Sequence, residues 1–446
     1  LSAVYDYGPY GSELKKNIKD YWWKSMTQLH DHIVGIDAAI FMHPTTWKAS
    51  GHVDNFSDPM IDNKDSKKRY RVDHLIEAFA EQLAPEAAAS LLNTMEQLIA
   101  ADDFAGLKNL IDTNNIKCAV SGTCNWTEVR QFNLMFGTQL GSVAEESSEI
   151  YLRPETAQGI FVNFLNVQKT GRMKIPFGIA QIGKAFRNEI VARGFIFRMR
   201  EFEQMEMQFF VRPGTQQEWY QYWKEARMKW HLSLGISPDK YRFHDHVKLA
   251  HYADAACDIE YDFPMGFKEL EGIHSRTDFD LKNHQQFSGK KLTYFDTELN
   301  QHYLPYVVET SIGLDRTFLM LLSEAYQEED LSTAEKQDAR VVLKLPAMLA
   351  PYKLAILPLL KKDGLPEIAK ELLAECRGSF KCFYEEKDAI GKRYRRMDAI
   401  GTPFCVTIDH QTKEDGTVTI RHRDSMLQER VALKDIKQLV LNAVQY

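Results

Sequence analysis

The sequence has little cysteine, no long uncharged apolar run and no excess of positive charge, and each shortage excludes a class of protein. Six cysteines in 446 residues are too sparse for a disulfide scaffold, so we expect a reducing, cytoplasmic setting. The most apolar segment, residues 345–360, contains Lys353 and three prolines, so no membrane helix or membrane partner is expected. A net charge of −7 argues against a surface that coats nucleic acid throughout.

The N-terminus does not resemble a secretory signal. The chain begins Leu-Ser-Ala-Val-Tyr-Asp, without a basic region followed by an apolar core, so we expect no secretory signal there. It also begins without methionine, so we expect a preceding segment.

The two parts of the chain differ in charge. Residues 346–446 carry three more basic than acidic residues, whereas the preceding part carries ten more acidic than basic. This asymmetry indicates either an anionic partner for the C-terminal part or ordinary drift in surface charge.

The length allows two to four domains at about 100–200 residues each. Helices are predicted where apolar residues recur every three or four positions, at residues 14–26, 75–110, 216–232, 314–326, 366–376 and 431–444. Strands are predicted at residues 36–42, twice within 177–211, and at 303–312, 355–359, 404–409 and 417–421. Polar loops are predicted at 54–69 and 327–336, the second as a linker, and Asp415-Gly416 predicts a hairpin turn.

A polar block lies across the two strands predicted within residues 177–211. Arg187 and Glu189 are predicted to share one strand face, and a second shared face holds Phe202, Gln204, Glu206 and Gln208. Interiors avoid such a density of polar groups unless these meet a ligand or each other. Arginine suits phosphate recognition and a flat ring stacks on a base. The block indicates either a nucleotide site on antiparallel strands or a solvated face with internal salt bridges.

A second block runs from Glu309 to Arg316. Glu309 and Ser311 are predicted to share a strand face, Gly313 lies where the strand meets a helix, and Arg316 falls in the first helical turn. Backbone donors and the helix dipole make such a junction suitable for anions. The alternative, an ordinary strand-to-helix turn, is favoured when this block is considered alone.

Together the two blocks resemble motifs two and three of the class II aminoacyl-tRNA synthetases. Four further segments closely resemble the glycyl-tRNA synthetase family of the homodimeric bacterial type: Asp6–Gly11, Arg153–Gly159, Glu269–Ile273 and Arg276–Leu281. The resemblance covers nearly the whole chain. It implies an α+β fold, with a catalytic domain at 1–337 built on an antiparallel sheet flanked by helices. It also implies a mostly helical insertion at about 60–145 and an α/β anticodon-binding domain at 338–446.

The resemblance implies an enzyme that activates glycine with ATP and transfers the glycyl group to the terminal ribose of tRNA(Gly). Arg187 and Arg316 would be catalytic, Arg187 on the α-phosphate and Arg316, with Arg198, on the β- and γ-phosphates. Phe202 would stack on adenine, and Glu189 would bind its exocyclic amine. The other ATP-binding positions implied are Asn188, Phe197, Met199, Glu269, Leu270 and Gly313. Glu269 would ligate the Mg²⁺ that accompanies ATP.

Glycine recognition is implied by the same route. Glu155, Glu206 and Glu309 match carboxylates that surround the ammonium, with Thr310 and Ser311 beside them. Arg71 matches a substrate-contacting arginine. Exclusion of larger amino acids by steric clash needs no editing, so we expect no editing domain.

The chain departs from the family at a zinc site. Many bacterial relatives carry two Cys-x-x-Cys pairs in the insertion, which suit structural zinc. The corresponding positions are Asn63 and Ser66, then Cys118 and Ser121, so at most one of four ligands is retained. His74 and Cys124 are nearby residues of ligand type, but we expect no zinc.

The C-terminal hundred residues resemble the anticodon-binding domain of class IIa synthetases. Its most basic run, Gly391–Asp398, indicates either phosphate contacts with the anticodon stem or a solvated helix face. The resemblance also implies a homodimer, with residues 14–44 at the interface.

Two other functions compete with a glycine-specific enzyme. A synthetase-like binding protein, such as the mitochondrial DNA polymerase accessory subunit, would have no reason to retain the catalytic set from Arg187 to Arg316. A synthetase for threonine, histidine or proline would need a differently lined pocket. The three carboxylates favour glycine.

Overall fold

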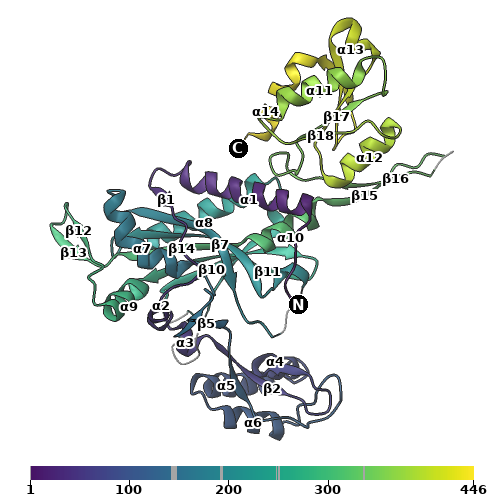
Figure 1. Ribbon diagram of the computed structural model, residues 1–446. Helices are drawn as coiled ribbons and strands as arrows, with labels where there is room; N and C mark the ends of the chain where they lie inside the picture. The colour runs from purple at the N-terminus through teal and green to yellow at the C-terminus, as the bar shows by residue number, and fades with distance from the viewer. Residues whose placement is uncertain are drawn as a thin grey trace.

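A computed structural model describes residues 2–141, 148–190, 194–247, 249, 252–334 and 337–445. Three bodies are visible in Figure 1: a central sheet with its helices, a small helical body below it, and a C-terminal α/β body above it. No helix of the described ranges is long and apolar enough to cross a membrane.

The central body is a seven-stranded sheet. Its strands, in spatial order, are β1 (Ile33–Gly35), β7 (Phe177–Phe186), β8 (Glu201–Val211), β14 (Tyr306–Gly313), β11 (Gly266–Thr277), β10 (Ala255–Phe263) and β9 (Tyr241–Asp245). Only the β1–β7 pair is parallel. The expectation of an antiparallel sheet in an α+β fold is confirmed.

Helices cover both faces of this sheet. One face carries α1 (Pro9–Thr27), α8 (Gln216–Ser233) and α10 (Leu314–Ala325), and we call these three the helix layer; the other carries α7 (Ala157–Thr170) and α9 (Phe279–Ser288). Strand β8 shows why helices cover both faces: its alternate residues Met205, Met207 and Phe209 point into the core under the helix layer. The intervening side chains, Glu206 and Gln208, therefore face the opposite side.

Helix α1 ties the sheet to its neighbours. Asp315, in the first turn of α10, accepts hydrogen bonds from Tyr7 (2.5 Å), from Lys15 (2.8 Å) and from the backbone N–H of Glu203 (2.9 Å). On its other side, Asn17 donates to the carbonyls of Leu349 and Ala350. Through Lys15, which also pairs with Glu203 on β8, and through Asn17, helix α1 thus links β8 and α10 to the chain that leads into the C-terminal body.

The lower body contains three helices and a small sheet. The helices are α4 (Val72–Ala80), α5 (Pro85–Ala100) and α6 (Phe104–Thr113), and the sheet pairs β2 (Ser57–Asp62) with β3 (Arg69–Arg71) and β4 (Arg130–Asn133). The loop predicted at 54–69 is therefore wrong over 57–62, because pairing with β3 and β4 stabilises a polar strand. The predicted end of the insertion near 145 lies outside the described residues.

The C-terminal body is a five-stranded sheet in the order β18 (Cys382–Tyr384), β17 (Leu354–Pro358), β19 (Phe404–Ile408), β20 (Thr417–His422) and β21 (Gln428–Ala432). Its helices are α11 (Leu365–Cys376), α12 (Ile390–Ile400), α13 (His410–Asp415) and α14 (Ile436–Val444). The predicted hairpin is wrong in detail, since α13, capped by Asp409, lies between β19 and β20. The last helix begins at Ile436 rather than at 431, because β21 pairs with β20.

Two further predictions need correction. Residues 327–336 were predicted as a linker, but β15 (Tyr326–Asp330) pairs with β16 (Ala339–Leu343) in a ribbon. The strand predicted at 36–42 lies instead at β1, and only Phe41 forms a bridge, to Leu152. Side chains hold this segment: Gln181 accepts from the N–H of Ala38, and Arg153 donates to its carbonyl.

The remaining described elements are short. They are α2 (Pro44–Ala49), α3 (His52–Asn55), β5 (Gly137–Leu140), β6 (Ser148–Tyr151), β12 (Tyr294–Asp296), β13 (Gln301–Tyr303), and the 3₁₀ turns η1 (Phe195–Phe197), η2 (Pro238–Lys240) and η3 (Leu433–Asp435).

Candidate functional site

The sheet register brings the predicted polar residues into two adjacent rows on the face away from the helix layer. The first row holds Gln181, Glu206, Ser311 and Gly272, and the second holds Ile179, Gln208, Glu309 and His274. Neighbouring strands lie about 4.8 Å apart, so side chains within a row are in contact range. Residues distant in sequence therefore form one polar floor.

Glu206 lies at the centre of this floor and is only 2% exposed. It accepts hydrogen bonds from the Thr156 hydroxyl and, at 2.8 Å, from Gln208 Nε2. Burial, followed by the charges of Glu309 and Glu155, raises the pKa of the Glu206 carboxyl well above its usual value. A cationic ligand beside this carboxyl would favour its ionised form.

Glu309 is the best-paired carboxylate of the set. Its oxygens accept from Gln208 Nε2 (2.6 Å), His274 Nδ1 (2.7 Å) and Arg276 Nη1 (3.0 Å). Burial opposes its ionisation, but Arg276 and His274 outweigh burial and lower the pKa of Glu309 to about 2. The same bond to Glu309 raises the pKa of His274 in spite of the burial of that ring.

Glu155 completes the set from the loop before α7. It accepts from Gln158 Nε2 at 2.9 Å, and His52 Nε2 lies 3.4 Å from its other oxygen. Burial disfavours its charged form, yet His52 and then Arg276 hold the pKa of Glu155 well below its usual range. Two ionised carboxylates therefore lie beside the carboxyl of Glu206.

Arg187 follows the end of β7, so the strand predicted to reach Glu189 stops at Phe186. The backbone N–H of Arg187 donates to the Arg200 carbonyl (2.9 Å), and its Nε donates to the Pro154 carbonyl (3.0 Å). Its guanidinium carbon lies 5.4 Å from the ring centroids of both Phe56 and Phe202. The Nε edge of the guanidinium is thus held by a backbone carbonyl, with two aromatic rings close by.

Arg316, in the first turn of α10, forms a second cationic cluster. It donates to the carbonyls of Phe197 (3.2 Å) and Glu269 (3.0 Å), and it lies 3.1 Å from the Glu269 carboxylate. Its guanidinium carbon stands 4.2 Å from the centroid of the Phe197 ring. Arg316 holds the pKa of the Glu269 carboxyl below its usual value.

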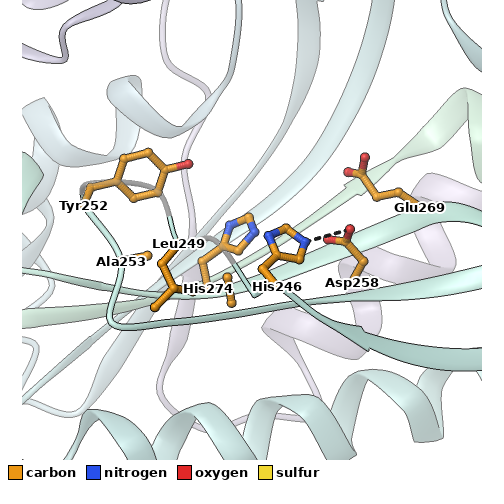
Figure 2. Close-up of a pocket in the computed structure, with 8 residues that line it drawn as sticks. His246, Leu249, Tyr252, Ala253, Asp258, Glu269 and His274 are labelled. Carbon is orange, nitrogen blue, oxygen red and sulfur yellow. Dashed lines mark hydrogen bonds and ion pairs between the residues drawn. The ribbon is translucent and has the colours of Figure 1, made fainter. Parts of the chain in front are cut away.

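A cavity of about 450 Å³ lies beside the Arg316–Glu269 pair (Figure 2). Its lining includes Glu269, His274, Asp258, His246 and Tyr252. His246 Nε2 lies 2.9 Å from Asp258, as the dashed line in Figure 2 shows. Two of its lining residues are partners of the groups described above: Glu269 pairs with Arg316, and His274 pairs with Glu309.

A bulge at Leu270 explains why Glu269 points into this cavity. Ile259 pairs with Glu271 and Glu260 pairs with Glu269, which leaves Leu270 as the extra residue. Leu270 is 1% exposed in the core under the helix layer, and Glu271 is also buried. The bulge thus puts Glu269 and Glu271 on opposite faces, which strict alternation would forbid.

The structure directs some of the predicted site residues elsewhere. The side chains of Met199 and Leu270 pack in the core under the helix layer, so they do not face the site. Thr310 stands opposite Met207 and Ile273, which are core residues, and is 1% exposed. Thr310 therefore faces away from Glu309 and Ser311.

The other predicted residues lie around the floor. Arg71, in the insertion, pairs with Asp58 (3.2 Å) and Asp73, so its guanidinium is engaged by other carboxylates than the predicted three. The backbone N–H of Asn188 donates to the Leu134 carbonyl at 2.7 Å. Arg198 is half-buried just before β8, and Gly313 leaves room beside the stem of Arg316.

Sequence reasoning missed a second set of charged residues. Arg276 is 5% exposed and holds Asp280 through two hydrogen bonds of 2.8 and 3.0 Å while it also donates to Glu309. His274 and Gln208 share Glu309 with it. Arg276 was part of a recognised motif, but only the register of β11 against β14 shows that it meets Glu309.

The four positions of the degraded zinc site converge in the insertion. Asn63 Oδ1 accepts from the backbone of Ser66 (2.9 Å) and from the Ser121 hydroxyl (2.9 Å). Cys118 Sγ lies 3.3 Å from Ser66 Oγ and 3.2 Å from Tyr70 Oη. Among the described residues, no group of three or more His, Cys, Asp or Glu is placed to hold a metal ion. Hydrogen bonds join the positions that a metal would otherwise join.

We predict that the insertion folds without zinc. Exhaustive chelation of zinc, with Mg²⁺ resupplied, should leave the thermal midpoint and the activity unchanged, because the Asn63 amide already links the two turns. Elemental analysis of the dialysed protein checks this. Zinc retained at one atom per chain would contradict the prediction.

The basic run at 391–398 lies on α12, and its arginines are engaged. Arg393 is 1% exposed and donates to the carbonyls of Pro358 (2.8 Å) and Glu385 (3.0 Å), so neither alternative, phosphate contact or a solvated helix face, describes this residue. Arg395 pairs with Asp338, and Arg396 pairs with Asp388. Lys392 stays exposed.

Comparison with protein families agrees with this geometry. The tRNA synthetase class II core domain (G, H, P, S and T) matches residues 138–325, and the anticodon binding domain matches 353–443. The glycyl-tRNA synthetase insertion domain 1 matches 58–90 and 84–134. The fold and the site therefore define a class II aminoacyl-tRNA synthetase.

Three curated relatives narrow the class. Glycine–tRNA ligase of Chlorobaculum tepidum is 56% identical over 97% of this chain and 92% of its own length. The enzymes of the same name from Treponema denticola (51%, over 96% and 89%) and Macrococcus caseolyticus (50%, over 100% and 94%) are similar. The chain belongs to the glycine–tRNA ligase family.

Proposed function

We propose that this protein joins glycine to the 3′-terminal ribose of tRNA(Gly) in two ATP-dependent steps. The observation that carries the proposal is the meeting of three carboxyl groups: Glu206 and Glu309 are buried on the floor, Glu155 lies beside them, and a small ammonium would compensate their negative charge. Glycine supplies that ammonium and adds no side chain. Larger amino acids would clash with the floor, and exclusion of a larger substrate by steric clash is simple to achieve.

The first step forms glycyl-adenylate. A carboxylate oxygen of glycine attacks the α-phosphorus of ATP, and the bond to the bridging oxygen breaks as diphosphate leaves. Arg187, held by the Pro154 carbonyl and close to Phe56 and Phe202, is suited to neutralise charge on the α-phosphate. Arg316 and Arg198 would bind the leaving phosphates, with Asn188, Glu189 and Phe197 completing the nucleotide site.

The second step transfers the glycyl group. A terminal ribose hydroxyl of tRNA attacks the adenylate carbonyl, and AMP leaves.

Mg²⁺ would enter with ATP to neutralise phosphate charge, and Glu269, which is half-exposed at the cavity rim, would hold it with one carboxylate. Gly313 and Ser311 would border the reacting groups.

Amino-acid specificity of ATP–pyrophosphate exchange tests the proposal. We expect exchange with glycine and Mg²⁺, and about a hundredfold less with alanine or serine, because a buried floor cannot accept an added carbon without displacing paired groups. Omission of amino acid gives the baseline. Alanine exchange equal to glycine exchange would refute the assignment.

The domain boundaries and the tRNA partner belong to the same proposal. We assign residues 1–337 to catalysis, with an insertion at about 60–145, and 338–446 to anticodon binding. The family match at 353–443 and the separate C-terminal core support the second body. Within residues 338–446, Asp398 on α12 forms buried pairs with Arg340 on β16 and with Arg421 on β20, which join β16 to this body.

We also propose a homodimer in the cytoplasm. The location rests on the six free thiols, and the assembly rests on the likeness of residues 14–44 to the interface motif of class II synthetases. Sedimentation equilibrium at micromolar concentration should give twice 51.5 kDa. A mass equal to that of one chain would contradict the dimer.

A further inference from the structure

Gln208 joins two of the three carboxyl groups through one side-chain amide. Its Nε2 donates to Glu206 Oε1 at 2.8 Å and to Glu309 Oε2 at 2.6 Å. Glu206 lies two residues earlier on β8, and Glu309 lies opposite Gln208 on β14, so all three side chains project from the same face of the sheet. The amide therefore bridges two acidic residues that come from different strands.

The orientation of this amide is set by the carboxyl groups. Gln208 is 0% exposed, and its Oε1 has no hydrogen-bond partner among the described residues. An unpartnered buried acceptor is unfavourable for folding, so the amide is not oriented by its own hydrogen-bonding needs. Rotation of the amide by half a turn would bring Oε1 against the ionised carboxylate of Glu309, which has no proton to donate. The observed orientation thus supplies both carboxyl groups with a donor and leaves one oxygen unpartnered.

The other donors around this pair act on one carboxyl group each. Thr156, which precedes α7, donates to Glu206. His274 and Arg276, both on β11, donate to Glu309. These bonds fix each carboxyl group to its own surroundings, whereas the shared amide sets the distance between the two groups. Without the amide, the negative charges of the two groups would favour a wider separation.

We propose that Gln208 is a positioning residue for glycine, because its amide holds the carboxyl groups of Glu206 and Glu309 close enough to share one ammonium. The inference rests on the proposed function, which puts glycine on this floor. An ammonium has three donors, and each carboxylate oxygen has two acceptor sites. Glu206 Oε1 and Glu309 Oε1 each accept one hydrogen bond from the described residues, so both retain a site for the ammonium.

Gln208→Met tests the role. Methionine has a similar length and fills the same buried space, but it donates no hydrogen bond. In ATP–pyrophosphate exchange the KM for glycine should rise roughly tenfold, since both carboxyl groups lose a donor. The KM for ATP and the rate at saturating glycine should stay within about twofold, because the contacts of Arg187 and Arg316 do not involve Gln208. A residue that only supports the fold would lower the rate and leave the ratio of the two KM values unchanged.

Gln168→Met is the matched control. Gln168 lies on α7, a helix that covers the same face of the sheet, and its amide donates to the Met173 carbonyl at 3.0 Å. The substitution removes an amide of the same kind and leaves the contacts of the three carboxyl groups intact. The KM for glycine, the KM for ATP and the rate should therefore all match those of the unmodified protein.

Gln208→Glu gives a second measurement if methionine disturbs the fold, because it preserves the shape of the side chain. The carboxyl group that it introduces can donate to a neighbouring carboxyl group only while it is protonated. The KM for glycine, relative to that of the unmodified protein, should therefore rise as the pH is raised. An unchanged KM for glycine in Gln208→Met, or a pH-independent ratio for Gln208→Glu, would overturn the role of Gln208. Absence of glycine-dependent exchange in the unmodified protein would instead refute the proposed function.

Discussion

Replacement of Arg187 by alanine should abolish glycine-dependent pyrophosphate exchange and tRNA charging together. The guanidinium is fixed by the Pro154 carbonyl and two aromatic rings, so it needs no rearrangement when charge develops on the α-phosphate. Loss of such a preorganised donor costs about 3 kcal/mol or more in the transition state, which is a factor of at least about a hundred in rate. Steady-state kinetics of both reactions measures the loss, and binding of tRNA should survive.

Lys184→Ala is the matched control for this charge change. Lys184 lies on β7, three residues before Arg187, and forms an exposed ion pair with Glu201. Exposed pairs contribute at most about 1 kcal/mol, so exchange should stay within a few-fold of the unmodified protein. Equal losses in the two variants would show that Arg187 acts through general surface charge rather than at the phosphate.

Removal of the C-terminal body should separate the two reactions. Because every residue of the floor and of the two arginine clusters precedes α11, exchange should remain within about twofold. Charging should fall more than a hundredfold, which corresponds to about 3 kcal/mol of lost tRNA binding. The chain is best cut after Pro351, since Leu345 and Leu349 pack in the core of the catalytic body and a cut at 337 would expose that core.

A matched variant tests whether the loss of charging reflects lost tRNA binding or a disordered catalytic body. Lys381→Ala, in the intact chain, removes the ion pair of 2.7 Å that joins the C-terminal body to Glu13 on α1. If the two bodies act independently, this variant should charge tRNA within a few-fold of the unmodified protein. Loss of exchange in the truncated chain would instead mean that the C-terminal body supports the catalytic fold.

Periodicity predicted those elements whose burial is one-sided. Helix α1 follows from the four-residue spacing of Leu14, Ile18, Trp22 and Met26, all of which are buried. Elements that depend on partners were missed: β2 is polar and forms because β3 and β4 pair with it, and β15 forms because β16 returns beside it. The residues of β2 and β15 alone do not indicate which strands will pair with them.

The candidate site divides in the same way. The sequence by itself determined the family and most of the residue set, because Arg187, Glu206, Glu309 and Arg316 stand in recognisable motifs with fixed spacing. Only the tertiary structure decided which of these residues meet. The register of four strands places Arg276 and His274 on Glu309, turns Thr310 away, and, through the bulge at Leu270, directs Glu269 into the cavity. The physical reason is that strand alternation assigns a face to each residue locally, whereas register, bulges and burial, which set neighbours and pKa values, arise only when distant strands pair.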